Sequence, residues 1–206
     1  MSYFLSHLPQ IGAMTLQHIA LVAGGLAIAL IIAVPLGVYA ARRPRAGTAI
    51  FAAAGIVYVI PSLALLAVAV RYLGLGALPV VLVLAAYAQF VLVRNVAAAL
   101  ANVPRAQLDA ADGLGFTRAQ RFWRIEVPLA TPVMLGGIRL AAVALIAIAT
   151  LGGYVGAGGL GNEIFLGLQR KYVEQTMAGS IPAAALAVIA DWLLRGLERS
   201  SRSRWA

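Results

Sequence analysis

Residues Asp109 to Pro128 read D-A-A-D-G-L-G-F-T-R-A-Q-R-F-W-R-I-E-V-P. This stretch is polar and basic, and long apolar segments flank it on both sides. Charged side chains cost free energy inside a bilayer, so a chain built of membrane-spanning helices keeps such a stretch at the surface. The stretch therefore predicts an ordered loop at one face of an otherwise membrane-embedded chain.

Composition supports the membrane assignment. Hydrophobic residues make up 62% of the 206 and charged residues 11%, and the mean hydropathy is +0.91. A soluble domain of this size does not tolerate so much apolar surface, so the composition predicts an integral membrane protein. The chain has no cysteine, which excludes disulfides and thiolate metal sites. His7 and His18 have no carboxylate cluster nearby, which favours a surface or interfacial role over a metal site.

The basic residues are grouped beside the apolar segments. A net charge of +9 is compatible with nucleic-acid binding, but cytoplasmic loops of membrane proteins are also rich in arginine. With the N-terminus outside and the C-terminus inside, the outer loops hold only Arg71, Arg170 and Lys171. We interpret the charge as membrane topology and expect no nucleic-acid partner. The groups assigned to the cytoplasm are Arg42, Arg43 and Arg45; Arg105, Arg118, Arg121 and Arg124; and Arg195, Arg199, Arg202 and Arg204.

Five apolar stretches are long enough to cross a bilayer, which requires about 20 helical residues. Thr15 is a candidate cap for the first, and Pro61 predicts a break or kink in the second, because proline lacks a backbone donor. Residues 1–10 lack the pattern of a cleavable signal peptide. We expect one all-α, five-helix membrane domain over residues 12–198, N-out and C-in. Its expected helices are residues 17–41, 47–71, 77–100, 128–151 and 177–197.

The polar loop, residues 105–127, has its own local signals. We expect one short helix over 105–114 and a second over 117–125, separated by flexible glycines. Thr117 and Gln120 fit a capping box at the start of the second helix. The arginines of that helix recur every three residues and are expected to share one face. They are Arg118, Arg121 and Arg124.

The loop resembles the cytoplasmic EAA loop of permease subunits from type I ATP-driven (ABC) importers. The family pattern is E-A-A, three residues, G, nine residues, I-x-L-P; here Asp109 replaces the glutamate and Val127 the leucine, and Ile125 matches. The resemblance implies that the loop docks in a groove of an ATPase subunit and transmits its movement to the membrane helices. Binding of anionic lipid headgroups is the alternative. The coupling residues implied are Asp109, Ala110, Ala111, Gly115, Arg118, Arg121 and Pro128.

The chain contains no phosphate-binding sequence of the form G-x-x-x-x-G-K-[ST]. We therefore expect a permease without its own ATPase site and without a cofactor. ATP and Mg²⁺ would bind to a partner ATPase, present in two copies.

A glycine-rich run satisfies G-x-G-x-x-G, but it follows a membrane segment, whereas a dinucleotide site needs a βαβ unit. The run instead resembles an outer loop in importers of compatible solutes, methionine and phosphonates. The segments I-P-S-L-A-L at 60–65 and I-P-A at 181–183, followed by Asp191, narrow the resemblance to permeases for osmoprotectants such as glycine betaine, choline, carnitine and proline. The outer-loop glycines are Gly156, Gly158, Gly159 and Gly161.

Several residues inside the apolar stretches are candidates for a transport pathway. A break at Pro61 leaves a backbone carbonyl that Ser62, water or a neighbouring helix must satisfy. Arg94 either snorkels to the inner surface or faces the bundle interior, and we expect Asp191 to pair with Arg195. Aromatic side chains near the break suit a quaternary ammonium through cation–π attraction, or they are ordinary helix packing. The pathway residues that we predict are Pro61, Ser62, Tyr87, Arg94 and Asn95, with Tyr58, Gln89 and Phe90 as wall residues.

The resemblance implies a dimeric permease core in the bacterial inner membrane, formed with a second copy or a paralogue. A substrate-binding protein would dock at the outer loops around 152–176, and lipid would surround the helices. The expected function is import of an osmoprotectant; a methionine or other small-solute importer is an alternative within the class. A passive channel or scaffold is the alternative outside it. The seven acidic residues are scattered, which argues against a membrane-embedded enzyme.

Overall fold

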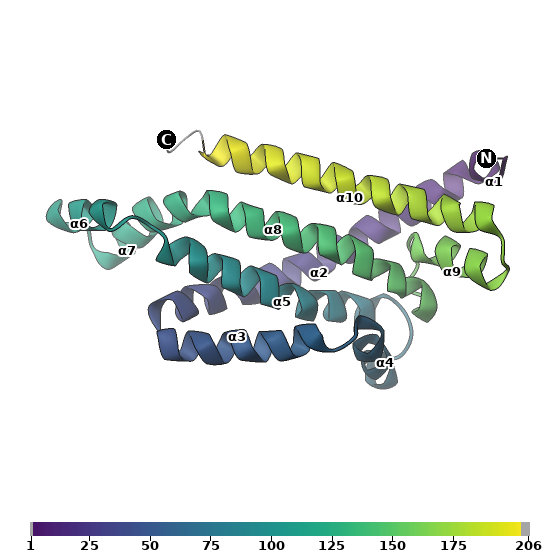
Figure 1. The fold of residues 1–206 in the computed structure, drawn as a ribbon, viewed down its shortest axis with the longest axis horizontal. Helices are drawn as coiled ribbons and strands as arrows, with labels where there is room; N and C mark the ends of the chain where they lie inside the picture. The colour runs from purple at the N-terminus through teal and green to yellow at the C-terminus, as the bar shows by residue number, and fades with distance from the viewer. Residues whose placement is uncertain (1, 203–206) are drawn as a thin grey trace.

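The computed structural model describes residues 2–202, and this part of the chain contains helices and turns but no strand. The all-α fold class is therefore confirmed. The elements, labelled in Figure 1, are α1 (Ser2–Ser6), α2 (Leu8–Arg42), α3 (Pro44–Val59), α4 (Ser62–Leu73), α5 (Ala77–Ala101), α6 (Arg105–Gly113), α7 (Arg118–Arg121), η1 (Phe122–Glu126), α8 (Val127–Ala149), η2 (Thr150–Val155), α9 (Gly161–Gln169) and α10 (Val173–Arg202).

The long helices run side by side, with α5 at the centre of the bundle (Figure 1). Helix α5 packs on α2, α3, α4 and α8, while α10 packs on α8 and α9. The core is correspondingly rich in α5 residues, and the side chains of Leu84, Leu92 and Val93 are almost completely buried. Four helices in the described residues are long and apolar enough to cross a membrane, or five if the bent pair α3 and α4 forms one span.

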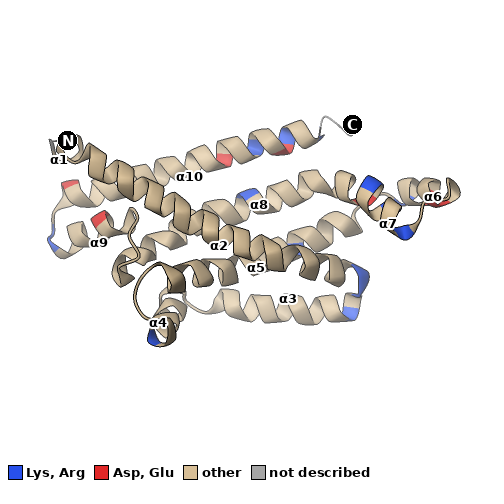
Figure 2. Cartoon of the chain, turned by 180° about the vertical axis from the view of Figure 1, so that it is seen from behind, with Lys and Arg blue, Asp and Glu red and all other residues tan. Residues whose placement is uncertain are grey.

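The two ends of the bundle carry different elements. Helices α6 and α7, the α2–α3 turn and the end of α10 lie together at one end, while α1, α4 and α9 lie at the other (Figure 1). Figure 2 shows arginines at the α2–α3 turn and around α6 and α7. We call this end the basic end, and the other the glycine-loop end, after the loop that precedes α9.

The structure differs from the sequence prediction at three places. Helix α2 begins at Leu8, so Thr15 lies inside it and its hydroxyl donates to the carbonyl of Ile11 at 2.8 Å instead of capping the helix. Helix α10 is longer than expected at both ends. The predicted break at Pro61 is confirmed, and α3 and α4 meet there at an angle of 91°. The second loop helix is not separate, because α7 continues through η1 into α8.

The turn η1 is π-helical, and it ends two residues before Pro128, near the start of α8. Proline has no backbone N–H to donate, and a wider helical turn is one of the ways in which a helix accommodates such a break. The backbone N–H of Val127 accordingly donates to the carbonyl of Phe122, five residues back. The helix therefore continues through a sequence that predicted a helix boundary.

Glycines allow α2 and α5 to approach closely. A Cβ at Gly25 would lie 2.6 Å from the Cβ of Leu84, and a Cβ at Gly37 would lie 2.6 Å from the Cβ of Val96. Small residues at membrane-helix contacts permit this close backbone packing. The contact fixes α2 on α5 at two levels of the bundle.

We predict that Gly37→Ala destabilises the protein by about 1–3 kcal/mol, the usual range for overpacking a tight interface. An added methyl would meet the side chain of Val96 and lie 3.0 Å from the carbonyl oxygen of Val93. The matched control is Gly12→Ala in the same helix, where no neighbouring atom lies within 4 Å. Thermal unfolding of the purified protein in detergent measures both, and equal midpoints for the two variants would contradict the prediction.

Candidate coupling loop and transport pathway

The loop at the basic end is organised around a buried carboxylate. Glu126 is 3% exposed and accepts hydrogen bonds from Arg42 at the end of α2 and from Arg121 Nε at 3.2 Å. Arg121 Nη1 also lies 2.5 Å from Asp112 Oδ2 in α6. A buried charge is tolerated when it is paired and hydrogen-bonded in this way. The network joins α2, α6, α7 and the start of α8 into one unit.

The predicted capping box is confirmed. The backbone N–H of Gln120 donates to Thr117 Oγ1 at 3.3 Å, and the backbone N–H of Thr117 donates to Gln120 Oε1 at 2.9 Å. Just before it, Gly115 has a φ of +78°, a conformation that glycine adopts at little cost. Gly113 has no such requirement and ends α6. Of these two glycines, only Gly115 is therefore required for the sharp turn between α6 and α7.

The predicted coupling residues occupy different environments in the loop. Asp109 and Ala110 are exposed, Ala111 is buried against the following turn, and Arg121 is held in the ion-pair network. Arg118 and Arg121 line one hollow with Asp112, whereas Arg124 lines another with Ala110 and Ile125. The three arginines, which were expected to share one face, are thus divided between two hollows.

Two large apolar side chains of the loop are exposed: Leu114 is 77% exposed and Trp123 is 67% exposed. Neither of them is among the predicted coupling residues, and neither is Glu126. Leucine inside a polar loop is a weak signal in sequence, and the burial of Glu126 depends on Arg42, which is distant in the chain. Exposed apolar residues beside charged ones are typical of a surface that binds another protein.

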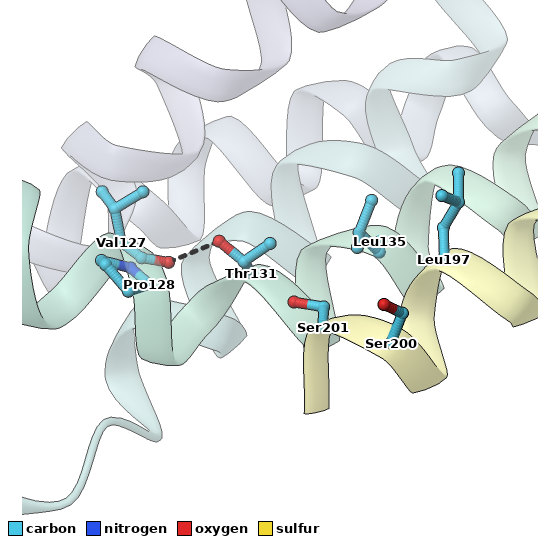
Figure 3. Close-up of a pocket in the computed structure, with 7 residues that line it drawn as sticks. All are labelled: Val127, Pro128, Thr131, Leu135, Leu197, Ser200 and Ser201. Carbon is cyan, nitrogen blue, oxygen red and sulfur yellow. Dashed lines mark hydrogen bonds between the residues drawn. The ribbon is translucent and has the colours of Figure 1, made fainter. Parts of the chain in front are cut away.

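Pro128 lines an apolar hollow of about 440 Å³ between the start of α8 and the end of α10 (Figure 3). Thr131 Oγ1 donates to the carbonyl of Val127 at 2.7 Å on one side of this hollow, and Leu197, Ser200 and Ser201 lie on the other. Val127 and Pro128, which line the hollow, directly follow η1 in the chain. The hollow leaves the loop end of α8 open on the side of α10.

At the break between helices α3 and α4, Ile60 has an extended backbone, Pro61 follows, and Ser62 begins α4. The hydroxyl of Tyr87 in α5 donates to the carbonyl of Ile60. Ser62, water or a neighbouring helix was expected to satisfy this carbonyl, and the neighbouring helix α5 provides the donor. Pro61, Ser62 and Tyr87 come together here, while Asn95 lies elsewhere, donating to the carbonyl of Val91 at 2.8 Å and packed on Gly137 of α8.

An aromatic row extends from this break along α3 and α5. The ring centroids of Tyr87 and Tyr58 are 5.9 Å apart, and those of Tyr58 and Phe90 are 4.8 Å apart. The guanidinium carbon of Arg94 lies 5.1 Å from the centre of the Phe90 ring and 5.9 Å from that of Phe51. We call Tyr87, Tyr58, Phe90 and Arg94 the aromatic row. Gln89, also a predicted wall residue, instead donates to the carbonyls of Ala29 and Ala85.

The glycine loop at the opposite end is anchored on α2. Gly156, Gly158 and Gly159 all have positive φ, and the N–H of Gly159 donates to Gln17 Oε1 at 3.0 Å. Gly161 lies so close to the carbonyl of Thr150 that any side chain there would overlap it. This loop joins two helices, η2 and α9. A dinucleotide-binding site needs a strand before the glycines, so such a site has no support in the described residues.

His18 lies beside the same loop and is fully buried, so the expected surface or interfacial role for this histidine is wrong. Its Nε2 is 3.0 Å from the carbonyl of Ile146 in α8. Its side chain also lies next to Gly159. Because α2, α8 and the glycine loop close around it, the burial depends on three distant segments. No group of residues in the described range 2–202 is arranged to hold a metal.

Helix α9, which was not predicted, is tied to the N-terminal helices by Glu163. Tyr3 Oη donates to Glu163 Oε2 at 2.9 Å, and Gln10 Nε2 donates to Oε1 at 3.5 Å. Burial, and after it the hydrogen bond to Glu163, raises the pKa of the Tyr3 phenol. Residues far apart in the chain thereby fix α1, α2 and α9 together.

Helices α8 and α10 are joined by ion pairs. Arg139 Nη1 lies 2.7 Å from Asp191 Oδ1, and Arg139 Nε lies 3.4 Å from Glu198 Oε2. The predicted pair of Asp191 with Arg195 is confirmed at 2.8 Å. The charges inside these apolar helices are therefore paired with one another, as buried charges in a membrane require.

A model of the protein family described as "Binding-protein-dependent transport system inner membrane component" matches residues 33–203. The chain belongs to this family. It is thus an inner-membrane component of a transport system, and the matched region includes the loop at the basic end, the aromatic row and the glycine loop. The resemblance stated from the sequence is confirmed at the level of the family.

Relatives of this transport component include osmoprotectant permeases. The chain is 35% identical over 185 residues to the choline transport system permease protein OpuBB of Bacillus subtilis, covering 90% of this chain and 85% of that protein. It is 35% identical over 201 residues to the osmoprotectant import permease protein OsmW of Salmonella typhimurium, covering 95% and 94%. It is 40% identical over 185 residues to the carnitine transport permease protein OpuCD of Listeria monocytogenes, covering 89% and 83%.

Solved structures of ABC importers share the fold of this permease. The chain superposes on the inward-facing MetNI methionine ABC transporter with a TM-score of 0.79 at 21% identity, covering 93% of this chain and 95% of that one. It superposes on an amino acid ABC transporter with a TM-score of 0.71 at 15% identity, covering 95% and 96%. At these identities the likeness shows the fold, which is the expected importer-permease fold.

We predict that Tyr87→Phe lowers the stability of the permease by about 1–3 kcal/mol, because the Ile60 carbonyl loses its side-chain donor in a partly buried setting. Tyr72→Phe is the control, since Tyr72 is exposed on α4. Thermal unfolding in detergent provides the comparison. A Tyr87→Phe protein as stable as the Tyr72→Phe protein would contradict a role for this hydrogen bond.

Proposed function

We propose that this chain is the permease subunit of an ATP-driven importer for small osmoprotectants such as glycine betaine, choline and carnitine. The observation that carries the proposal is its similarity to permeases named for these solutes, over about nine-tenths of its length. The likeness to a methionine transporter, at 21% identity, bears on the fold only, and the alternative of another small solute stays open.

In this proposal the basic end lies in the cytoplasm and the glycine-loop end lies outside. The arginines at the α2–α3 turn and around α6 and α7 support this orientation, because inner loops are enriched in basic residues. The substrate-binding protein docks at the outer loops around residues 152–176. A second permease, identical or paralogous, completes the pathway.

The loop of residues 105–127 is the docking surface for two ATPase subunits, one on each permease, which bind ATP and Mg²⁺ and carry out hydrolysis. Exposed Leu114, Trp123 and Arg118 provide apolar and charged contacts for this partner. The Glu126 network behind them holds the loop rigid on α2 and α8. A push on the loop therefore moves the membrane helices as a unit.

Docking of the ATPase is tested by Gly115→Val. Valine at a φ of +78° costs about 1–3 kcal/mol of backbone strain, so we expect the turn to change and the co-purified ATPase to fall sharply. Gly113→Val is the control, since that position has ordinary φ and no atom within 4 Å of an added Cβ. The measurement is the ratio of ATPase to tagged permease after affinity purification in mild detergent.

Recovery of the wild-type permease alone, in several mild detergents, would contradict the ATPase partnership and favour a passive channel or scaffold. Equal recovery of ATPase with both valine variants would contradict the role assigned to Gly115.

The substrate class is tested by uptake into proteoliposomes containing the permease, its ATPase and its binding protein. We expect ATP-dependent uptake of labelled glycine betaine, choline or carnitine, inhibited by an excess of the unlabelled compound. Uptake of methionine without uptake of any quaternary ammonium compound would overturn the assignment. Vesicles lacking internal ATP are the control for passive leakage.

A further inference from the structure

Arg94 differs from several other arginines of the membrane helices in its contacts. Arg42, Arg139 and Arg195 each lie within 4 Å of a carboxylate. Among residues 2–202, no carboxylate forms such a pair with Arg94; its guanidinium contacts the rings of Phe90 and Phe51 instead. Arg94 is also exposed in the isolated chain. The structure therefore presents a cation at an uncovered face of the bundle without an anion.

The side chain of Arg94 is directed away from the end of α5 that lies at the basic end. Arg94 precedes Ala101, the last residue of α5, by about 10 Å at a rise of about 1.5 Å per residue. Its guanidinium lies against Phe90, one helical turn further from the basic end. An exposed charge at this depth requires water or protein around it and not lipid. The face of α3 and α5 that carries Arg94 thus borders a wet cavity or a second subunit.

Tyr58 and Phe90 continue the row from Arg94, whereas Tyr87 at its other end is buried. Tyr58 is 43% exposed although it is stacked on Phe90, and the row ends at Tyr87 beside the Pro61 break. Helix α3, which carries Tyr58, has only Gly47 buried in the isolated chain. A solute that passes along this face meets aromatic rings and a guanidinium within a short distance of each other.

These groups match two opposite charges of one small molecule. Aromatic rings attract a quaternary ammonium, and a guanidinium binds a carboxylate through two parallel hydrogen bonds. Betaines such as glycine betaine and carnitine carry both groups on one short carbon chain. Choline carries the ammonium but has a hydroxyl where glycine betaine has the carboxylate.

We propose that the aromatic row is a substrate site within the permease that selects zwitterionic quaternary ammonium carboxylates. Arg94 binds the carboxylate, and the exposed ring of Tyr58 binds the trimethylammonium group. The proposal rests on the proposed function, and it adds a preference for betaines over choline that is set by the membrane subunit itself.

The test is direct binding of radiolabelled glycine betaine and of choline to the purified permease–ATPase complex without its binding protein. We expect Arg94→Gln to weaken glycine betaine binding about tenfold or more, the usual effect of losing a charged hydrogen-bond partner, and to leave choline binding unchanged. Tyr58→Leu should weaken both ligands about two- to thirtyfold through loss of a cation–π contact. Arg71→Gln, at an exposed arginine of α4 outside the row, should change neither.

Equal loss of both ligands in Arg94→Gln would overturn the proposal and indicate a structural or subunit-interface role. Unchanged glycine betaine binding in that variant, or no binding to the wild-type complex when uptake is intact, would also overturn it. Should Arg94→Gln fail to assemble, Arg94→Lys retains the charge without the paired donors, and it should weaken only glycine betaine. The proposed function fails separately, if the complete wild-type importer takes up no quaternary ammonium compound.

Discussion

The packing of α5 against α2, α3, α4 and α8 is the interaction on which the rest of the structure depends. In hydrocarbon there is little hydrophobic drive between helices, so close van der Waals contact must hold them together. The glycines at positions 25 and 37 provide that contact by bringing α2 onto α5. With α5 fixed, the aromatic row on one side and the contact with α8 on the other are fixed as well.

Much of the fold was predictable from the sequence. The apolar stretches, the break at Pro61 and the capping box of Thr117 and Gln120 are local features, and local signals identified them. The angle of 91° between α3 and α4 was not predictable, because a proline indicates a break without its direction. Helix α9 was missed because its nine residues are too few to form a recognisable span.

The candidate site was harder to predict from the sequence than the fold, because its contacts join residues far apart in the chain. The sequence indicated that the loop is basic, but the burial of Glu126 requires Arg42 from another helix. The location of Arg94 was predicted within an apolar stretch, yet its contact with Phe51 depends on how α3 lies against α5. His18 had no sequence signal for burial, because α8 and the glycine loop cover it only in the folded bundle.

The helical stretch from Arg118 to Val155 is 38 residues long and begins at the loop of the basic end and finishes beside the glycine loop. A continuous helix of this kind is stiff. Displacement of one end of the helix is therefore transmitted to the other end without passing through a flexible joint. In the proposed importer, one partner would bind near each terminus. Suppose that binding of the ATPase favours one position of this helix, and that this position favours docking of the substrate-binding protein outside. Thermodynamic linkage then requires the reverse effect: docking of the substrate-binding protein must strengthen binding of the ATPase by the same factor.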